Sequence, residues 1–218
     1  MSKYSNSDDF LLVSSFGAMS SGQIYVVPGV KDAVAKGSVA NLKPVMLNTP
    51  KFSWPNNVKV VPEDVFGERV IVVPDGFLVP LKSNGGIYAV RIDPQDVTKT
   101  TGTVKISAKK DGYFYHMGYW VDLNGDGRKD YITARSNAKK GQGELLWFEH
   151  PEKGLDSGTS WVEHSLGNLA DVAFELVTLP EYKEEIVVFS AHFFDEAVRM
   201  IRVSTVDGSL VATRTIDD

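Results

Sequence analysis

The segment Asp130-Tyr-Ile-Thr-Ala-Arg-Ser136, followed after a turn by Gly143-Glu-Leu-Leu-Trp-Phe148, decides the fold of this chain. Both halves are short, rich in β-branched and aromatic residues, and bounded by Gly, Asn or Asp. That pattern predicts a β-hairpin. The same arrangement occurs three more times in the sequence, at residues 10–16 with 22–27, 69–73 with 86–92, and 185–190 with 197–203.

The four hairpins form a repeat. Their equivalent residues Leu11, Val70, Ile132 and Ile186 recur after 59, 62 and 54 residues. A further candidate strand follows every hairpin, at residues 44–47, 103–107, 161–166 and 210–216. Another precedes the second, third and fourth hairpins, at residues 58–61, 115–121 and 173–178. The unit is therefore four strands, A to D, and the first repeat lacks strand A.

A four-stranded unit repeated every 40–60 residues or so is typical of a β-propeller blade. We predict an all-β fold and a single propeller domain over residues 1–218, with repeats at about 8–50, 57–108, 112–167 and 170–217. Helix is expected only as a short segment at residues 30–36. A β-sandwich with coincidental spacing is the alternative.

About four blades account for the whole chain. They would form either a small propeller or part of a larger ring. A larger ring would be completed by a second copy or by another chain. The missing strand A favours association, because an unpaired strand edge invites pairing.

The composition excludes several classes of protein. The 218 residues carry a net charge of −5 and no basic cluster, so nucleic-acid binding is not expected. No apolar run is long enough to predict a membrane span. The chain has no cysteine, which excludes disulfides, thiolate nucleophiles and Cys-ligated zinc.

The stretch Asp122-Leu-Asn-Gly-Asp-Gly-Arg-Lys-Asp130 lies between strands A and B of the third repeat. Calcium takes about 6–8 oxygen ligands, and a curled loop offers side chains on alternate residues. The predicted Ca²⁺ ligands are the side chains of Asp122, Asn124, Asp126 and Asp130 and the carbonyl of Arg128. Position twelve of this loop is Thr133 instead of Glu, so it is not an EF-hand. A turn rich in Asp, Asn and Gly that binds no ion is the alternative.

The string Tyr119-Trp-Val-Asp-Leu-Asn-Gly-Asp-Gly-Arg-Lys-Asp-Tyr-Ile132, with residues 143–151 and 161–166 after it, resembles the FG-GAP/VCBS repeat. This repeat forms the propeller blades of integrin α-subunit heads and of many secreted proteins. The resemblance covers roughly residues 112–166, and the other repeats share only the strand pattern. It implies one structural Ca²⁺ site and an extracellular location, although residues 2–9 are polar and no secretory signal is visible. Propellers of this family usually have more than four blades, which this chain does not supply alone.

The B–C and D–A loops should meet on the face opposite the A–B loop. They carry aromatic residues among polar ones, a composition that suits sugar rings or a protein partner. The candidate ligand-binding residues are Trp54, Phe77, Tyr113, His192 and Phe193. For each aromatic residue, a place in the core between blades is the alternative.

The preferred interpretation is a calcium-binding propeller that acts as a non-enzymatic binding module for a glycan or a protein partner. A propeller-fold carbohydrate lyase or dehydratase is the alternative. Its acid and base would be His116 and Glu175, both expected on A strands at the central channel, and this rests on analogy between folds. A purely structural module is a third interpretation. No phosphate loop and no nucleophile elbow is present.

Overall fold

The computed structural model describes residues 9–17, 20–76, 84–108, 110–137 and 140–217. Blade 1 contains three strands, β1 (Phe10–Gly17), β2 (Ser20–Pro28) and β3 (Val45–Met46). Blade 2 contains β4 (Lys59–Val60), β5 (Val70–Pro74), β6 (Ile87–Ile92) and β7 (Thr100–Lys105). Blade 3 contains β8 (Phe114–Val121), β9 (Asp130–Asn137), β10 (Gln142–Glu149) and β11 (Val162–Gly167). Blade 4 contains β12 (Ala173–Val177), β13 (Glu185–His192), β14 (Ala197–Ser204) and β15 (Leu210–Asp217).

Each blade is one antiparallel sheet whose strands pair in chain order. The four predicted hairpins are thereby confirmed as strands B and C, and the flanking segments as strands A and D. Blade 1 begins with strand B, as predicted, and it is the three-stranded sheet of the four. The chain has the β-propeller fold, and four separate sheets exclude the β-sandwich alternative.

Apolar side chains on facing sheets hold neighbouring blades together. Strands of a half-buried sheet alternate inward and outward, so each blade between two others contributes one set of side chains to each neighbour. Blades 1 and 2 share a core that includes Ile24, Val26, Ile71 and Val90. The other face of blade 2 packs on blade 3 around Val72, Ile87, Tyr131 and Leu146. Blades 3 and 4 meet around Ile132, Trp147, Val188 and Ile201.

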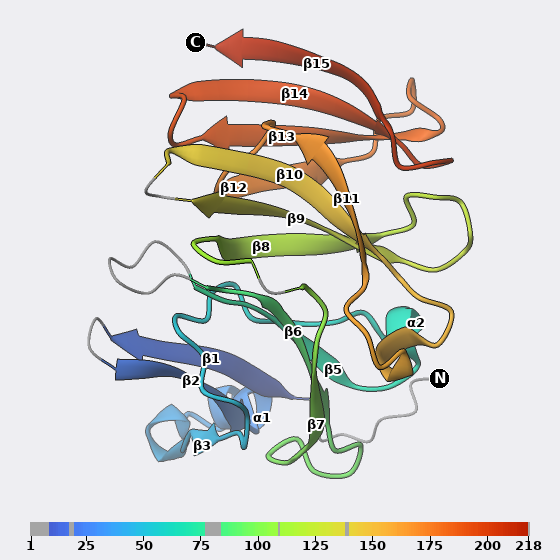
Figure 1. Ribbon diagram of the computed structural model, residues 1–218. Coiled ribbons are helices and arrows are strands. Elements are labelled where there is room, and N and C mark those ends of the chain that lie inside the picture. The colour runs from blue at the N-terminus through green and yellow to red at the C-terminus, as the bar shows by residue number, and fades with distance from the viewer. Residues whose placement is uncertain (1–8, 18–19, 77–83, 109, 138–139, 218) are drawn as a thin grey trace.

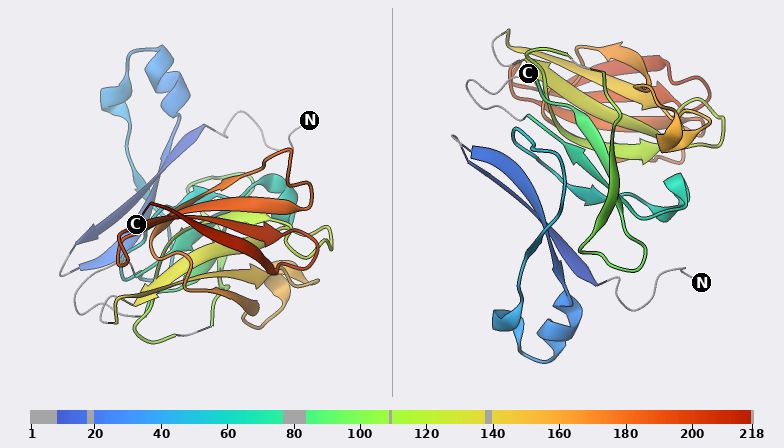
Figure 2. Two further views of the ribbon diagram at one scale, coloured as in Figure 1. Left: turned by 90° about the horizontal axis from the view of Figure 1, so that it is seen from above. Right: turned by 60° about the horizontal axis from the view of Figure 1, so that its bottom comes forward.

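The blades stack from blade 1 to blade 4 without closing into a ring (Figure 1). Blade 1 lies at one end of the stack and blade 4 at the other, with blades 2 and 3 between them. Figure 2 shows β1 and β2 at the end of the stack and α1 (Val30–Ala35) extending away from the other blades. Of the two arrangements left open by the sequence, the structure is the partial ring.

Helices are few and short. The predicted segment near residue 30 forms α1 (Val30–Ala35), between strands C and D of blade 1. The sequence did not indicate α2 (Glu63–Phe66), which lies in the A–B loop of blade 2. Two single 3₁₀ turns lie at Val39–Asn41 and Gly154–Asp156. No helix in the part of the chain that the structure describes is long and apolar enough to cross a membrane.

Candidate functional site

Among the described residues, blade 1 has no strand at the inner edge that strand A occupies in the other blades. In blades 2, 3 and 4, strand A pairs with strand B through β4–β5, β8–β9 and β12–β13. Among the described strands, β1 pairs only with β2. Within the described residues, no strand occupies its second edge from Phe10 to Ser14.

The direction of the backbone groups on β1 follows from one hydrogen bond. The Gly29 amide donates to the carbonyl of Asp9 at 2.8 Å, so Asp9 points toward β2. The N–H and C=O groups of successive residues point to opposite edges of an antiparallel strand. The backbone groups of Leu11 and Val13 therefore also point toward β2. The N–H and C=O groups of Phe10, Leu12 and Ser14 then point to the free edge.

The outer face of blade 1 is apolar and open. Phe10 and Leu12 pack toward blade 2, whereas Leu11 and Val13 lie on the opposite face of the strand. Leu11 is 53% exposed, and Met46 on the same face is 56% exposed. In blades 2 and 3 the corresponding faces are covered by a neighbouring blade.

The outer face of blade 4 is also open but more mixed in character. Phe189 and Met200 lie opposite each other on β13 and β14, next to Val198, which is 38% exposed. The same face carries Arg202, whose guanidinium stacks on the ring of Tyr182 with 4.6 Å between the charge centre and the ring centroid. The two ends of the stack therefore offer surfaces of different chemistry.

Loop 122–130 curls around its own carboxylates. The amides of Gly125 and Gly127 donate to the two oxygens of Asp122, each at 2.8 Å. Both glycines have positive φ angles, 73° and 83°, which the tight turn requires. Asp130 is fully buried and accepts hydrogen bonds from the amides of Leu123 (2.9 Å) and His150 (2.8 Å). The pKa of Asp130 is raised to about 6, chiefly by burial and also by the nearby charges of Asp126 and Asp122, although the two hydrogen bonds lower it.

The donor types of this loop suit a hard cation such as Ca²⁺. Asn124 and Asp126 complete a set of four oxygen-bearing side chains at alternate or near-alternate positions. In the present arrangement, however, the Arg128 guanidinium pairs with Asp126, and the Arg128 amide donates to the other Asp126 oxygen. Within the described residues, no three His, Asp or Glu side chains are grouped so that they could hold a metal ion. Coordination by Asp126 would therefore require Arg128 to swing away.

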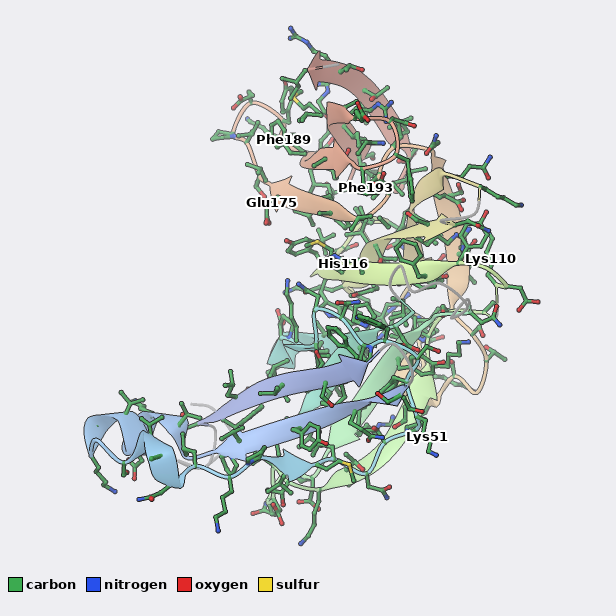
Figure 3. The ribbon with its side chains drawn as sticks, turned by 90° about the vertical axis from the view of Figure 1, so that its left-hand side faces the viewer. Lys51, Lys110, His116, Glu175, Phe189 and Phe193 are labelled. Carbon is green, nitrogen blue, oxygen red and sulfur yellow. The ribbon has the colours of Figure 1, made fainter. Side chains whose placement is uncertain are left out.

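The A strands carry a short polar chain across blades 2, 3 and 4. The Tyr119 hydroxyl on β8 donates to Glu175 on β12 at 2.9 Å, and the Lys59 ammonium on β4 lies 4.7 Å from the centroid of the Tyr119 ring. The pKa of Tyr119 is raised to about 12, first by burial and then by the hydrogen bond to Glu175 and its charge. His116 is half-buried on β8, where burial lowers its pKa. Figure 3 shows His116 and Glu175 on the same side of the stack. The direct partner of Glu175 is the Tyr119 hydroxyl, which the sequence did not indicate.

The B–C loops lie at one end of the strands and loop 122–130 at the other (Figure 1). On this face Trp54 stacks on Phe16, with ring centroids 4.3 Å apart. Phe193, labelled in Figure 3, is 65% exposed. Its ring contacts the ring of Phe194 edge-on. His192 is 5% exposed, and its ring donates to the carbonyl of Leu169 at 2.6 Å, which makes it a part of the core. Phe77 lies outside the described residues.

Tyr113 borders a cavity of about 250 Å³ on the same face. The other lining residues are Gln142, Gly143, Glu144, Gly167 and Asn168. Behind it, the buried guanidinium of Arg135 pairs with Glu144 and forms two hydrogen bonds to Glu163, at 2.5 and 2.6 Å. The sequence does not indicate this network, because its three members come from strands B, C and D and meet only in the folded blade.

Comparisons with known proteins support the fold and do not extend to function. No protein-family model matches the chain, and no curated protein sequence matches it. A solved structure titled "Structure of Dos1 propeller" is similar, with a TM-score of 0.60 and 16% sequence identity. The match covers 99% of this chain and 46% of that chain, so this chain spans just under half the length of that propeller. Identity this low establishes the propeller fold alone, and the FG-GAP/VCBS resemblance remains a prediction.

Proposed function

We propose that this chain is a protein-binding module, a partial propeller whose two end blades bind a partner that completes the ring. The observation that carries the proposal is the open apolar face of blade 1, where Leu11 and Met46 are more than half exposed. By contrast, the faces at which neighbouring blades meet are closed by apolar cores. Exposed apolar side chains gathered on one face are typical of a protein interface.

The similarity to a longer propeller chain supports the same proposal. This chain aligns over 99% of its residues with 46% of that longer chain. The curvature of the stack is thus compatible with a ring about twice as long. A partner that supplies the remaining blades would cover both end faces at once.

Site-specific photo-crosslinking tests this proposal. A benzophenone amino acid is placed at Val13 on the outer face of blade 1 and, in a separate variant, at Val198 on the outer face of blade 4. The control position is Glu152, an exposed residue in the C–D connection of blade 3. After irradiation in extracts of the source cells, mass spectrometry should identify the same second polypeptide from positions 13 and 198 and not from 152. Equal crosslinking from all three positions, or none from the end faces, would contradict the proposal.

The loop 122–130 supports a second, independent proposal, that the chain binds Ca²⁺. Asp122, Asn124, Asp126 and Asp130 would supply side-chain oxygens, with the Arg128 carbonyl as a further ligand. The ion would neutralise the mutual repulsion that contributes to the raised pKa of Asp130, and would tie β8 to β9. An FG-GAP/VCBS-type blade and an extracellular location, where free calcium is abundant, belong to this proposal.

The cavity beside Tyr113 favours a glycan as a second class of ligand. An aromatic side chain bordered by Gln142, Glu144 and Asn168 offers a stacking surface together with hydrogen-bonding groups. A glycan-array screen of the wild-type chain and of Tyr113→Ala tests it. Signals that Tyr113→Ala abolishes are expected, and signals equal in both proteins would contradict a site at this cavity.

A further inference from the structure

We propose that the free edge of β1 accepts an extended strand of the partner, which becomes strand A of blade 1. This inference rests on the proposed ring-completing function and specifies how the partner binds. The recognised chemistry is a segment of about 5–8 residues with apolar side chains at alternate positions and unpaired backbone groups.

The first support is the chain's own precedent. Three times in this molecule strand A pairs antiparallel with strand B, most extensively in β8–β9 and β12–β13. In β12 the residues Phe174 and Leu176 are the apolar members of the alternation, and Glu175 lies between them. β1 occupies the strand B position, its burial alternates from Phe10 to Val13, and no described strand pairs with its inner edge.

The second support is the backbone geometry of β1. Phe10, Leu12 and Ser14 direct their amide and carbonyl groups to the free edge, as the Gly29–Asp9 hydrogen bond establishes. An incoming strand would therefore find donors and acceptors at three alternate residues. These groups are the ones that a strand A would use.

The third support is a cavity in the expected position. It measures about 410 Å³ and lies between Phe10 of β1 and Val60 of β4, the strand A of the next blade. Val61 and Pro62 make its wall apolar, and Glu63 and Glu68 are charged residues in its lining. The side chains of a strand added to β1 would fill this space between the two blades.

The arrangement also indicates what kind of partner supplies the strand. A second copy would present the same open edge, because among the described strands β1 of each copy pairs only with β2. Two copies would thus leave two unpaired edges. The structure favours a different polypeptide segment, one that carries the remaining blades and one surplus strand.

A peptide-binding experiment tests strand addition. The probe is a fluorescent synthetic peptide with the sequence of residues 171–179, which contains β12, and binding to the full chain is followed by fluorescence anisotropy. Two N-methylated versions serve as controls, one methylated at residues 174 and 176 and the other at 173, 175 and 177. A strand pairs through alternate amides, so one methylation pattern should abolish binding and the other should preserve it.

Two protein variants locate the binding edge. Ser14→Pro removes an outward-pointing amide without affecting the pairing with β2, and Ser14→Ala keeps that amide. Proline is tolerated on edge strands, and thermal unfolding of both variants verifies that they fold. Ser14→Pro should weaken peptide binding about tenfold relative to Ser14→Ala, which corresponds to about one lost hydrogen bond.

The results separate this inference from the proposed function. Equal binding by the two Ser14 variants, equal binding of both methylated peptides, or no binding of the unmodified peptide would overturn strand addition. Ring completion would still stand if the crosslinks from Val13 and Val198 were obtained. Peptide binding without those crosslinks would support strand addition and contradict ring completion.

Discussion

At the scale of single residues, glycine and buried charge fix the geometry of the blades. Gly208 has a positive φ of 69°, and a Cβ there would approach the Trp147 ring to 2.3 Å. The Trp147 indole also donates to the Gly208 carbonyl at 3.2 Å. This turn of blade 4 is therefore shaped by a side chain of blade 3.

We expect Gly208→Ala to destabilise the chain by about 2–4 kcal/mol, because left-handed backbone strain and overpacking against Trp147 both act. Urea unfolding measures the change. Gly158→Ala is the matched control, since Gly158 has a φ of 72° and a Cβ added there would meet no described atom within 4 Å. It should lose only about 1–2 kcal/mol from backbone strain. Equal losses would show that Trp147 does not restrict the turn.

The Arg135 network predicts a pH dependence. Burial by itself would raise the pKa of Glu144, but hydrogen bonds from Ser165 and Arg135 outweigh it and lower the pKa below 4.5. The ionised carboxylate thus contributes stability that is present above pH 4.5 and lost as the pH falls through the lowered value. Glu144→Gln should make the free energy of unfolding less steeply dependent on pH below 4.5. An unchanged slope between about pH 3 and 4.5 would contradict this role for Glu144.

The contacts of His192 and Tyr119 could not be predicted from the sequence. His192 precedes aromatic loop residues in the sequence and is therefore a candidate for ligand binding on sequence grounds. Its burial depends on Leu169, 23 residues away in the chain, and on a hydrogen bond from Arg199. Tyr119 likewise meets Glu175 only because neighbouring blades bring their A strands together. Contacts of this kind have no local pattern in the sequence.

At the scale of elements, hairpin strands were predictable because β-branched residues and bounding glycines coincide, as in β9 and β10. The four-residue helix α2 was not, since a single turn has no recognisable periodicity. The sequence predicted that blade 1 begins with strand B, and its described residues do begin with β1. The exposure of Leu11 and Val13 could not be predicted from the sequence. A strand that is apolar on both faces has the same sequence pattern whether or not a second blade covers its outer face.

The unpaired edge of β1 predicts an alternating pattern of amide hydrogen exchange. The amides of Leu12 and Ser14 should exchange rapidly, whereas those of Leu11 and Val13, which face β2, should be protected. In β9, which lies between β8 and β10, consecutive residues such as Ile132 and Thr133 should both be protected. Residue-resolved NMR exchange measures the pattern. Uniform protection along β1 in the isolated chain would show that its second edge is already paired.

The loop 122–130 predicts a calcium-dependent gain in stability. Calcium added after chelation should raise the melting temperature, since a ligand at about 100 times its Kd contributes roughly 2.7 kcal/mol. Asp126→Asn should lose this gain, and Glu152→Gln, which removes an exposed acid elsewhere, should keep it. Differential scanning calorimetry provides the measurement. A shift that is the same in all three proteins would remove the site from this loop.

At the scale of the whole molecule, the four blades form an open stack with two uncovered ends. The fold consists of four similar sheets. A sheet buries both of its faces only where it has a neighbouring blade on each side. Blades 2 and 3 have two neighbours, whereas blades 1 and 4 have one. Ring completion, strand addition at β1 and the exposed apolar residues all follow from this incompleteness.

Cysteine crosslinking tests the open arrangement most directly, because the chain contains no cysteine of its own. The pair Val13→Cys and Val198→Cys places one thiol on each end face. The positive control is Asp64→Cys with Lys129→Cys, at a position where blades 2 and 3 form an ion pair of 2.6 Å. With a short bismaleimide at low protein concentration, the control pair should crosslink within one chain and the end-face pair should not. Efficient intramolecular crosslinking of the end-face pair would show a closed four-bladed ring and contradict the account.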